Sequence, residues 1–399
     1  MYFFIYNNSS FKSKIGQLFF IIVFITCLVS CKKKGCTDPL ATNYDLDAKK
    51  DNGTCVYEDF DKQAMLTNIT NNYIIPAISN YKTKCDALNN SSNSFVLNPN
   101  LQNLDTLRST WVSALLSWQD VSFLDFGPAE YIILKSQTNI YPTDTTLIND
   151  NINTGNWNFT NSTYFDQKGF QALDYLLNKP NFSDQQLIDY FILNLNAKDY
   201  LTDLTQDILD NTTYVYNEWN GSYKTTFIND YESNAQGSSV SNIVNALCLH
   251  YEFYLRRGKI GLPLGVFNGW SQLEMPELVE CYYYGQSLPF ATQAISSLEK
   301  CINGVNFNTE ENGQGFDDYM NFANAVYNNN LLSVTINDQI SDINSSLNAL
   351  NDPLSSEITS NKPAVSSTYQ KMQQLVPYLK LDMTSSLGVA ITYQDNDGD

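Results

Sequence analysis

The chain has 399 residues, of which 43% are hydrophobic, so it is long enough for two domains with sizeable cores and too apolar to be intrinsically disordered. Its formal net charge of −19 argues against binding nucleic acids, because phosphate recognition needs clustered lysine and arginine. The acidity is compatible with cation binding and equally with simple solubility. A single histidine, His250, excludes zinc sites built from several histidines, including the H-E-x-x-H motif of zinc proteases.

Positions 1–30 are typical of an export signal. Lys12 and Lys14 precede an apolar run over 15–29, which is too short for a convincing membrane-spanning helix. The run ends in Leu-Val-Ser-Cys31, which resembles the lipobox of bacterial lipoproteins and implies cleavage before Cys31 and lipid attachment to it. An ordinary signal peptide followed by a chance cysteine is the alternative. Both interpretations predict export. The lipobox further predicts a bacterial cell-envelope protein, anchored to the outer membrane on its periplasmic or its surface side.

Residues 31–60 combine this anchor with a small module rich in cysteine and aspartate. Cys36 and Cys55 bracket a short loop and are expected to form a disulfide, because so small a segment cannot bury a core. Its acidic side chains offer the oxygen ligands that calcium prefers. The candidate calcium ligands are Asp38, Asp45, Asp47 and Asp51. A disulfide-bonded loop with solvated acids is the other interpretation.

Four further cysteines follow the module. They are Cys85, Cys248, Cys281 and Cys301, and none has the C-x-x-C spacing of a zinc site. A disulfide between Cys281 and Cys301 and a set of buried free thiols are both compatible with the sequence.

From Asp61 onward, apolar residues recur at helical spacing almost throughout, which predicts an all-α protein. The first apolar stripe breaks near Pro76. The stretch 89–100 is rich in Asn and Ser and is expected to be a loop. A long amphipathic helix then begins near Leu101 and is expected to end or turn at Pro128, since proline interrupts a helix.

The middle of the chain predicts a loop, a helix and a domain boundary. Residues 136–165 lack clean periodicity and predict a long surface loop. Ser183 is a candidate N-cap for a helix that continues to Ile208. Glycine and serine punctuate the following stretch, so we place the boundary there. This divides the helical part into an N-terminal bundle, 61–235, and a C-terminal bundle, 236–399.

The C-terminal half predicts four helices and an extended tail. The first helix is expected to end at Arg256-Arg257-Gly258, because basic residues in the last turn and a following glycine favour a helix C-terminus. The others are expected to include Phe322 to Tyr327, Ile336 to Leu350 and Val365 to Leu379. Residues 388–393 alternate like a short strand, and the acidic residues 395–399 are expected to be a solvated tail.

The stretch that begins Gly169-Phe170-Gln171 is the first of several segments with a recognisable motif. It resembles the Gly-x-His-x-x-Glu segment of the imelysin-like family of insulin-cleaving membrane peptidases, with Gln171 in place of the histidine and Asp174 in place of the glutamate. A tryptophan-rich helix that finishes in Phe-Gly-Pro resembles a second signature, in which Ser122 takes the position of an acid. Gly-Leu-Pro-Leu-Gly over 261–265 is similar to the family's Gly-Ile-Pro-Leu-Gly connector. Glu280 and Ser287 match a Glu-x-x-Tyr-Ser-x-x-Ser segment.

The resemblance implies two related helical bundles packed together, with a polar site between them. It assigns to that site Gly169, Gln171, Asp174, Ser122, Glu280 and Ser287. Without the histidine, Asp174 and Glu280 form an oxygen-only set that could hold a hard divalent cation weakly. The same side chains could instead satisfy buried hydrogen bonds between helices. The set is poor for hydrolysis, which needs an open metal with a tuned base.

We therefore expect a non-catalytic envelope lipoprotein linked to metal or iron acquisition. A metal-dependent peptidase is the alternative that the family resemblance implies. An interaction scaffold, which would use some of the 26 tyrosines as contact surface, is a third hypothesis. The expected partners are the membrane, through the lipid anchor, and a metal ion or a peptide. His250 lies among apolar residues and is expected to be a packing or surface side chain of a helix.

Overall fold

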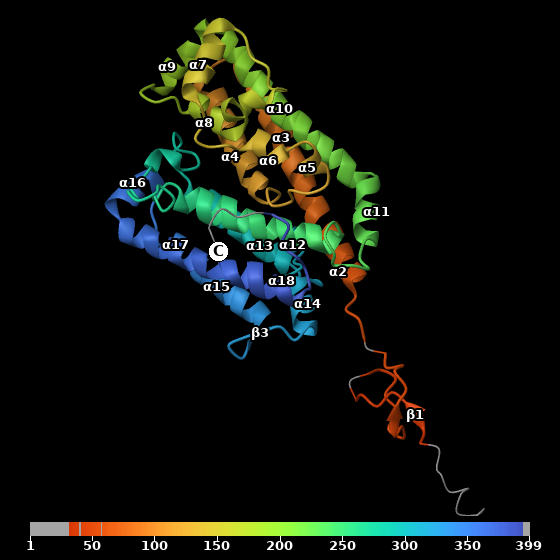
Figure 1. Ribbon diagram of the computed structural model, residues 1–399. Coiled ribbons are helices and arrows are strands. Elements are labelled where there is room, and N and C mark those ends of the chain that lie inside the picture. Colours follow the sequence, from red (N-terminus) through yellow and green to blue (C-terminus); the bar gives the residue numbers. More distant parts are fainter. Residues whose placement is uncertain (1–31, 40, 57, 394–399) are drawn as a thin grey trace, which may run out of the picture. The chain divides into compact units, whose positions relative to one another are not determined.

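The computed structural model describes residues 32–39, 41–56 and 58–393, and the chain divides after Phe60 into two compact units (Figure 1). The predicted signal, the anchor position Cys31 and the acidic tail 395–399 lie outside the described residues. Within the described ranges, no helix is long and apolar enough to cross a membrane.

The first unit is a small module closed by the predicted disulfide between Cys36 and Cys55, which the structure confirms. Strands β1 (Lys34–Gly35) and β2 (Lys50–Asp51) pair in parallel beside it. Most of the module's described side chains are exposed, so the disulfide and the local turns hold it rather than a hydrophobic core.

The second unit is a pair of helical bundles, which confirms the predicted all-α fold. The first bundle is built on three long helices, α3 (Ile75–Leu97), α4 (Leu101–Gln119) and α10 (Leu195–Asn220), and α8 (Gly169–Leu177) packs against α4 and α10. The other elements of this bundle are α2 (Lys62–Asn68), η1 (Ile69–Ile74), α5 (Pro128–Tyr131), α6 (Leu134–Thr138), α7 (Thr145–Thr154), η2 (Ser162–Gln167), α9 (Asp184–Leu193) and α11 (Ser222–Asn229).

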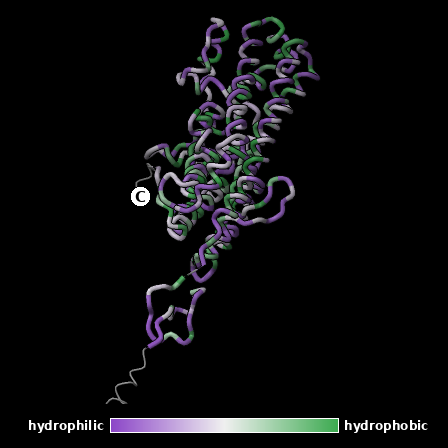
Figure 2. Tube along the Cα trace, turned by 90° about the vertical axis from the view of Figure 1, so that its right-hand side faces the viewer, coloured by the Kyte–Doolittle hydropathy of each residue, from purple (hydrophilic) through white to green (hydrophobic). Residues whose placement is uncertain are grey.

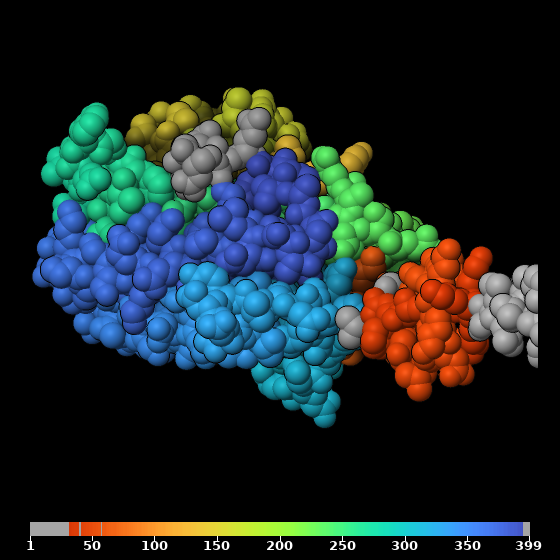
Figure 3. Space-filling view, turned by 60° about the horizontal axis from the view of Figure 1, so that its bottom comes forward, coloured from red at the N-terminus to blue at the C-terminus, as the bar shows by residue number. Residues whose placement is uncertain are grey.

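In the second bundle, α15 (Leu332–Leu347) contacts both α13 (Leu288–Ile302) and α17 (Lys362–Pro377), and α17 also contacts η3 (His250–Gly261). Figure 2 shows apolar and polar positions alternating along the helices, as expected when one face of each helix is buried. Figure 3 shows the C-terminal helices as one continuous, closely packed surface. The remaining elements are α12 (Ser239–Leu249), η4 (Pro276–Leu278), α14 (Phe316–Phe322), β3 (Val326–Tyr327), β4 (Asn330–Leu331), α16 (Leu354–Ser360), η5 (Tyr378–Met383) and α18 (Thr384–Ser386).

The two bundles meet where α4 ends against α13. The carboxylate of Asp120, the residue that caps α4, accepts hydrogen bonds from Gln293 at 2.6 Å and from Ser297 at 2.7 Å. Its backbone carbonyl accepts a third from the Tyr73 hydroxyl at 3.1 Å. Burial raises the pKa of Asp120, and these donors oppose the rise. Whether the bundles are separate domains at the predicted boundary stays a prediction.

The sequence prediction was wrong about α3, because it placed a break near Pro76 and a loop over 89–100. The helical path continues from η1 through Pro76, the second residue of α3, and the carbonyl of Asn72, four residues earlier, accepts the backbone N–H of Phe307 at 2.8 Å instead. The predicted loop 89–100 is helical as far as Leu97. The hydroxyls of Ser91 and Ser94 donate to helix carbonyls, Ser91 to that of Leu88 and Ser94 to that of Asn90, each at 2.9 Å.

Two further predictions were wrong in the middle of the chain. The expected loop 136–165 contains α7, which Asp144 caps at its start and Gly155 ends in the left-handed conformation. The expected single helix from Ser183 to Ile208 is two helices. Asn194 separates them, because it ends α9 and its side chain caps α10. The predicted cap at Ser183 is confirmed, as a capping box with Gln186.

Three predictions were wrong in the second bundle. Helix η3 passes Gly258 and ends at Gly261. Val326 and Tyr327 form strand β3 of a small hairpin, with β4, rather than a helix. Residues 388–393 form no strand; Thr392 instead donates its backbone N–H to the side chain of Asn245 at 2.8 Å. The four cysteines that follow the module are buried free thiols, so Cys281 and Cys301 form no disulfide.

Candidate functional site

Helix α8, which carries Gln171 and Asp174, is buried along its whole length. It begins at Gly169, whose φ of +77° lies in the left-handed region. A Cβ at this position would lie 2.2 Å from the carbonyl oxygen of Thr138, so the close approach of these two segments requires glycine. The glycine therefore sets where α8 starts and which way Gln171 and Asp174 point.

Gln171 uses both ends of its amide in contacts outside α8. Its Oε1 accepts the backbone N–H of Cys281 at 2.8 Å, and its Nε2 donates to Oδ1 of Asn139 at 2.8 Å. Nε2 also lies 3.7 Å from the sulfur of Cys281. The amide thus links α8 both to the segment after α6 and to the second bundle.

Asp174 holds the next part of the same segment of the second bundle. Its two oxygens accept the backbone N–H groups of Tyr283 at 3.0 Å and Tyr284 at 2.8 Å, and Asn178 donates to Oδ1 at 3.1 Å. Burial raises the pKa of Asp174 to about 7, although the three hydrogen bonds oppose the rise. Cys281, at the start of the segment, has a φ of +57°, which is strained for a residue with a side chain. The hydrogen bonds from the segment 281–284 to Gln171 and Asp174 of α8 hold the backbone in this conformation.

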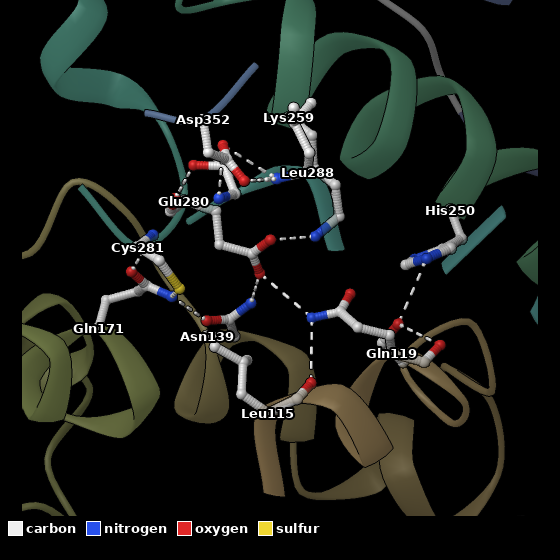
Figure 4. A network of polar contacts seen from close by, with 12 residues as sticks. Leu115, Gln119, Asn139, Gln171, His250, Lys259, Glu280, Cys281, Leu288 and Asp352 are labelled. Carbon is white, nitrogen blue, oxygen red and sulfur yellow. Dashed lines mark hydrogen bonds and ion pairs between the residues drawn. The ribbon is translucent and has the colours of Figure 1, made fainter. Parts of the chain in front are cut away.

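Glu280 is the centre of the polar network in Figure 4. It is 1% exposed and forms an ion pair with Lys259. Its Oε1 accepts hydrogen bonds from Asn139 at 2.7 Å and from Gln119 at 3.2 Å. Its carboxylate therefore has partners from both bundles.

Ser287 holds the backbone of Glu280 in place. Its hydroxyl donates to the backbone carbonyl of Glu280. The backbone N–H groups of Ser287 and Leu288 donate to Asp352, which holds the start of α13. Ser287 thus fixes the backbone that presents Glu280.

Ser122 contacts the only histidine of the chain. Its Oγ lies 3.3 Å from Nε2 of His250, and it donates to the backbone carbonyl of Gln119 at 3.4 Å. Burial lowers the pKa of His250 well below its usual value, and the charges of Lys135 and Lys259 lower it further. The ring is therefore neutral at physiological pH. Its Nδ1 has no hydrogen-bond partner among the described residues, so no acid orients it as in a Ser-His-Asp triad.

The structure thus brings the residues at the family positions into one region. Gln171 reaches Glu280 through Asn139, and Ser122 reaches it through Gln119. The sequence analysis missed four participants: Gln119, Asn139, Lys259 and the position of His250. Asn139 lies in a stretch that the sequence predicted as loop, and no spacing relates these residues to one another. No sequence signal could have found them.

The residues do not fit a resident metal ion. Among the described residues, no three or more His, Cys, Asp or Glu side chains converge on one point. Asp174 and Glu280 each have three protein donors, so a cation at the predicted site would compete with these contacts. In the N-terminal module, Asp45 pairs with Lys33 at 2.9 Å and Asp51 accepts the N–H of Gly53. The four aspartates of the module belong to no such group among the described residues, and the calcium site stays a prediction.

Two hollows lie beside the network. An outer cleft of about 190 Å³ is lined by Gln171, Asp174 and Glu277 together with Tyr141, Tyr282 and Tyr283. An inner cavity of about 30 Å³ lies near Ser122 and His250. Tyr141 lines both, so it stands between them.

Fold and site define a two-bundle helical protein whose interface is closed by buried hydrogen bonds around one ion pair. Residues 74–380 match the sequence profile of the imelysin family, and the chain belongs to that family. No curated protein matches the chain.

Solved structures share the fold. The chain is similar to a protein of Parabacteroides distasonis assigned as an iron-regulated protein A precursor, at 17% identity and a TM-score of 0.64, over 82% of this chain and 94% of that one. It is also similar to an imelysin-like protein of Psychrobacter arcticum, at 16% identity and a TM-score of 0.61, over 83% of this chain and 97% of that one. Identities this low show the fold alone.

Proposed function

We propose that the protein is a non-catalytic binding protein of the bacterial cell envelope that serves iron acquisition, attached to the outer membrane by lipid on Cys31. One observation carries the proposal that the protein is non-catalytic. The side-chain oxygens of Gln171 and Asp174, at the family motif, accept hydrogen bonds from backbone N–H groups within 281–284 and so join α8 to that segment. The leader supports the envelope location. The fold shared with the protein assigned as iron-regulated supports the link to iron.

The ligand is better sought in the outer cleft than at a bare metal site. The cleft, at about 190 Å³, is smaller than the roughly 300–1,000 Å³ of typical small-molecule sites, so it would hold one part of a larger ligand. Its lining of tyrosines with Glu277 and Asp174 suits a peptide side chain that is aromatic or basic.

A metal-dependent peptidase remains the alternative because of the family. It would need an open coordination position and a base aimed at the bound water. The carboxylates of Asp174 and Glu280 face protein donors instead, and Gln171 is neither a base nor a nitrogen ligand.

The test combines peptide cleavage with growth under iron limitation. The purified chain from Lys32 should cleave no peptide with zinc, iron or calcium added, and the double variant Gln171→His with Asp174→Glu serves as the restored-motif comparison. A deletion strain should grow poorly under iron chelation and recover with excess iron or with the wild-type chain. Metal-dependent cleavage by the wild type, or a deletion strain indifferent to iron, would overturn the proposal.

A further inference from the structure

The inner cavity behind Tyr141 is lined by side chains of both bundles. The first bundle contributes Trp118, Gln119, Ser122, Lys135, Asn139 and Tyr141, and η3 contributes His250, Tyr254 and Lys259. No carboxylate is among these lining residues, although the chain as a whole is strongly acidic. Two lysines and no acid therefore line this cavity, and the carboxylate paired with each lysine lies outside the lining.

The ammonium group of Lys135 has N–H donors that lack an acceptor among the described residues. Its side chain is 8% exposed, and its Nζ lies 3.3 Å from the carboxylate of Asp125 and 4.0 Å from the centre of the Tyr254 ring. An ammonium group has three N–H donors, and one carboxylate oxygen uses at most one of them. Burying the others without an acceptor is costly. Lys259, on η3, also lines the cavity and is paired with Glu280, which is not among the lining residues.

His250 adds a buried polar atom without a partner. The residue is 3% exposed, its Nε2 contacts Ser122, and its ring stacks on Tyr254 with centroids 5.8 Å apart. Its Nδ1 has no hydrogen-bond partner within the described chain. Whichever nitrogen of the neutral ring carries the proton, the charged donors that line the cavity are those of Lys135 and Lys259. An anion accepts hydrogen bonds from such donors and presents no hydrogen of its own to them.

The volume restricts which anion fits. A cavity needs roughly 10–15 Å³ of this kind of volume to hold one water. The inner cavity, at about 30 Å³, has room for a halide or a compact carboxylate group. Its two ammonium groups favour a single negative charge, because each already faces a carboxylate on its other side.

We infer that the inner cavity is a binding site for a small monovalent anion, either a halide or a carboxylate group, held by Lys135 and Lys259. The site goes beyond the proposed function and does not depend on it. The anion could be free, or it could be the carboxylate end of a ligand that extends past Tyr141 into the outer cleft.

The first test is crystallographic and uses the wild-type mature chain. Crystals soaked in sodium bromide should show an anomalous peak in the cavity, in contact with Nζ of Lys135. A cavity without a bromide peak, or with density that only water explains, would overturn the inference.

Thermal melting at constant ionic strength is the second test. Bromide, chloride and formate should raise Tm in a saturable way, and sulfate should not. Lys135→Met should abolish the saturable part. Lys82→Met is the matched control, because Lys82 forms an ion pair with Asp86 and lines neither the cleft nor the cavity. An equal rise with every anion, or an unchanged response in Lys135→Met, would contradict the site.

The same melts distinguish the two sources of the anion. If butyrate stabilises as well as formate, the site takes the carboxylate end of a larger ligand. If only halides and formate act, it takes a free anion. Either result supports the site. The peptide and growth tests of the proposed function do not involve added anions, so the two ideas fail separately.

Discussion

At the residue scale, Asp174 gives the clearest dependence on pH. Burial raises its pKa to about 7 from the usual 3.8, so the folded chain holds the proton more tightly than the unfolded chain. The contribution to stability is present in full below pH 4 and is lost as the pH rises through 7.

We expect the free energy of unfolding of the wild type, relative to Asp174→Asn, to fall between pH 4 and pH 8 by an amount on the order of a few kcal/mol. The variant cannot titrate at this position, and all other groups are common to both proteins. Urea unfolding at several pH values measures the difference. Parallel stability curves would show that Asp174 titrates alike in both states.

The site residues also show what a single sequence can predict. Gln171 and Asp174 are three positions apart on one helix, so their common surface follows from helical geometry. That their partners are the N–H groups of Cys281, Tyr283 and Tyr284 does not follow, because those partners are more than a hundred residues away. Local spacing carries no information on such distant pairing.

At the scale of elements, the start of α8 depends on Gly169. We expect Gly169→Ala to destabilise the protein by about 3 kcal/mol, because the added Cβ would lie 2.2 Å from the carbonyl oxygen of Thr138 and φ is +77°. Denaturant unfolding measures the loss.

The matched control is Gly237→Ala. Gly237 has a φ of +90°, and nothing lies within 4 Å of the position that a Cβ would take, so this variant bears the conformational cost without the clash, about 1 kcal/mol. Equal losses in the two variants would mean that the contact with Thr138 relaxes and does not fix α8.

The ends of helices were the least predictable feature of the fold. Pro76 and the Asn- and Ser-rich stretch after it indicated breaks, yet α3 runs through both. The proline sits in the first turn, and packing against α4 and α10 outweighs the weak helix propensity of Asn and Ser. At Asn194 the sequence predicted one continuous helix and the structure has a break. Asn194 ends α9, and its side chain caps the start of α10.

At the scale of the whole molecule, the predicted anchor has a direct test. Lipid at Cys31 would keep the protein with the membrane, because each buried methylene contributes about 0.8 kcal/mol to membrane binding. We expect the wild type to sediment with membranes and to incorporate labelled palmitate, and Cys31→Ser to do neither. Cys27→Ser is the control, since Cys27 lies in the segment predicted to be removed. A Cys31→Ser protein that stays membrane-bound would contradict the lipid anchor.

The fold class, the disulfide module and the family were all predictable from the sequence. These rest on local information: helical periodicity, two cysteines that bracket a short loop, and ordered motifs. The tertiary structure alone decided that the motif residues lock two bundles together, that His250 meets Ser122, and that Lys135 and Lys259 face one cavity. These outcomes depend on which distant segments pack together, because burial and pairing, rather than residue type, decide whether a carboxylate is a ligand, a base or a hydrogen-bond acceptor.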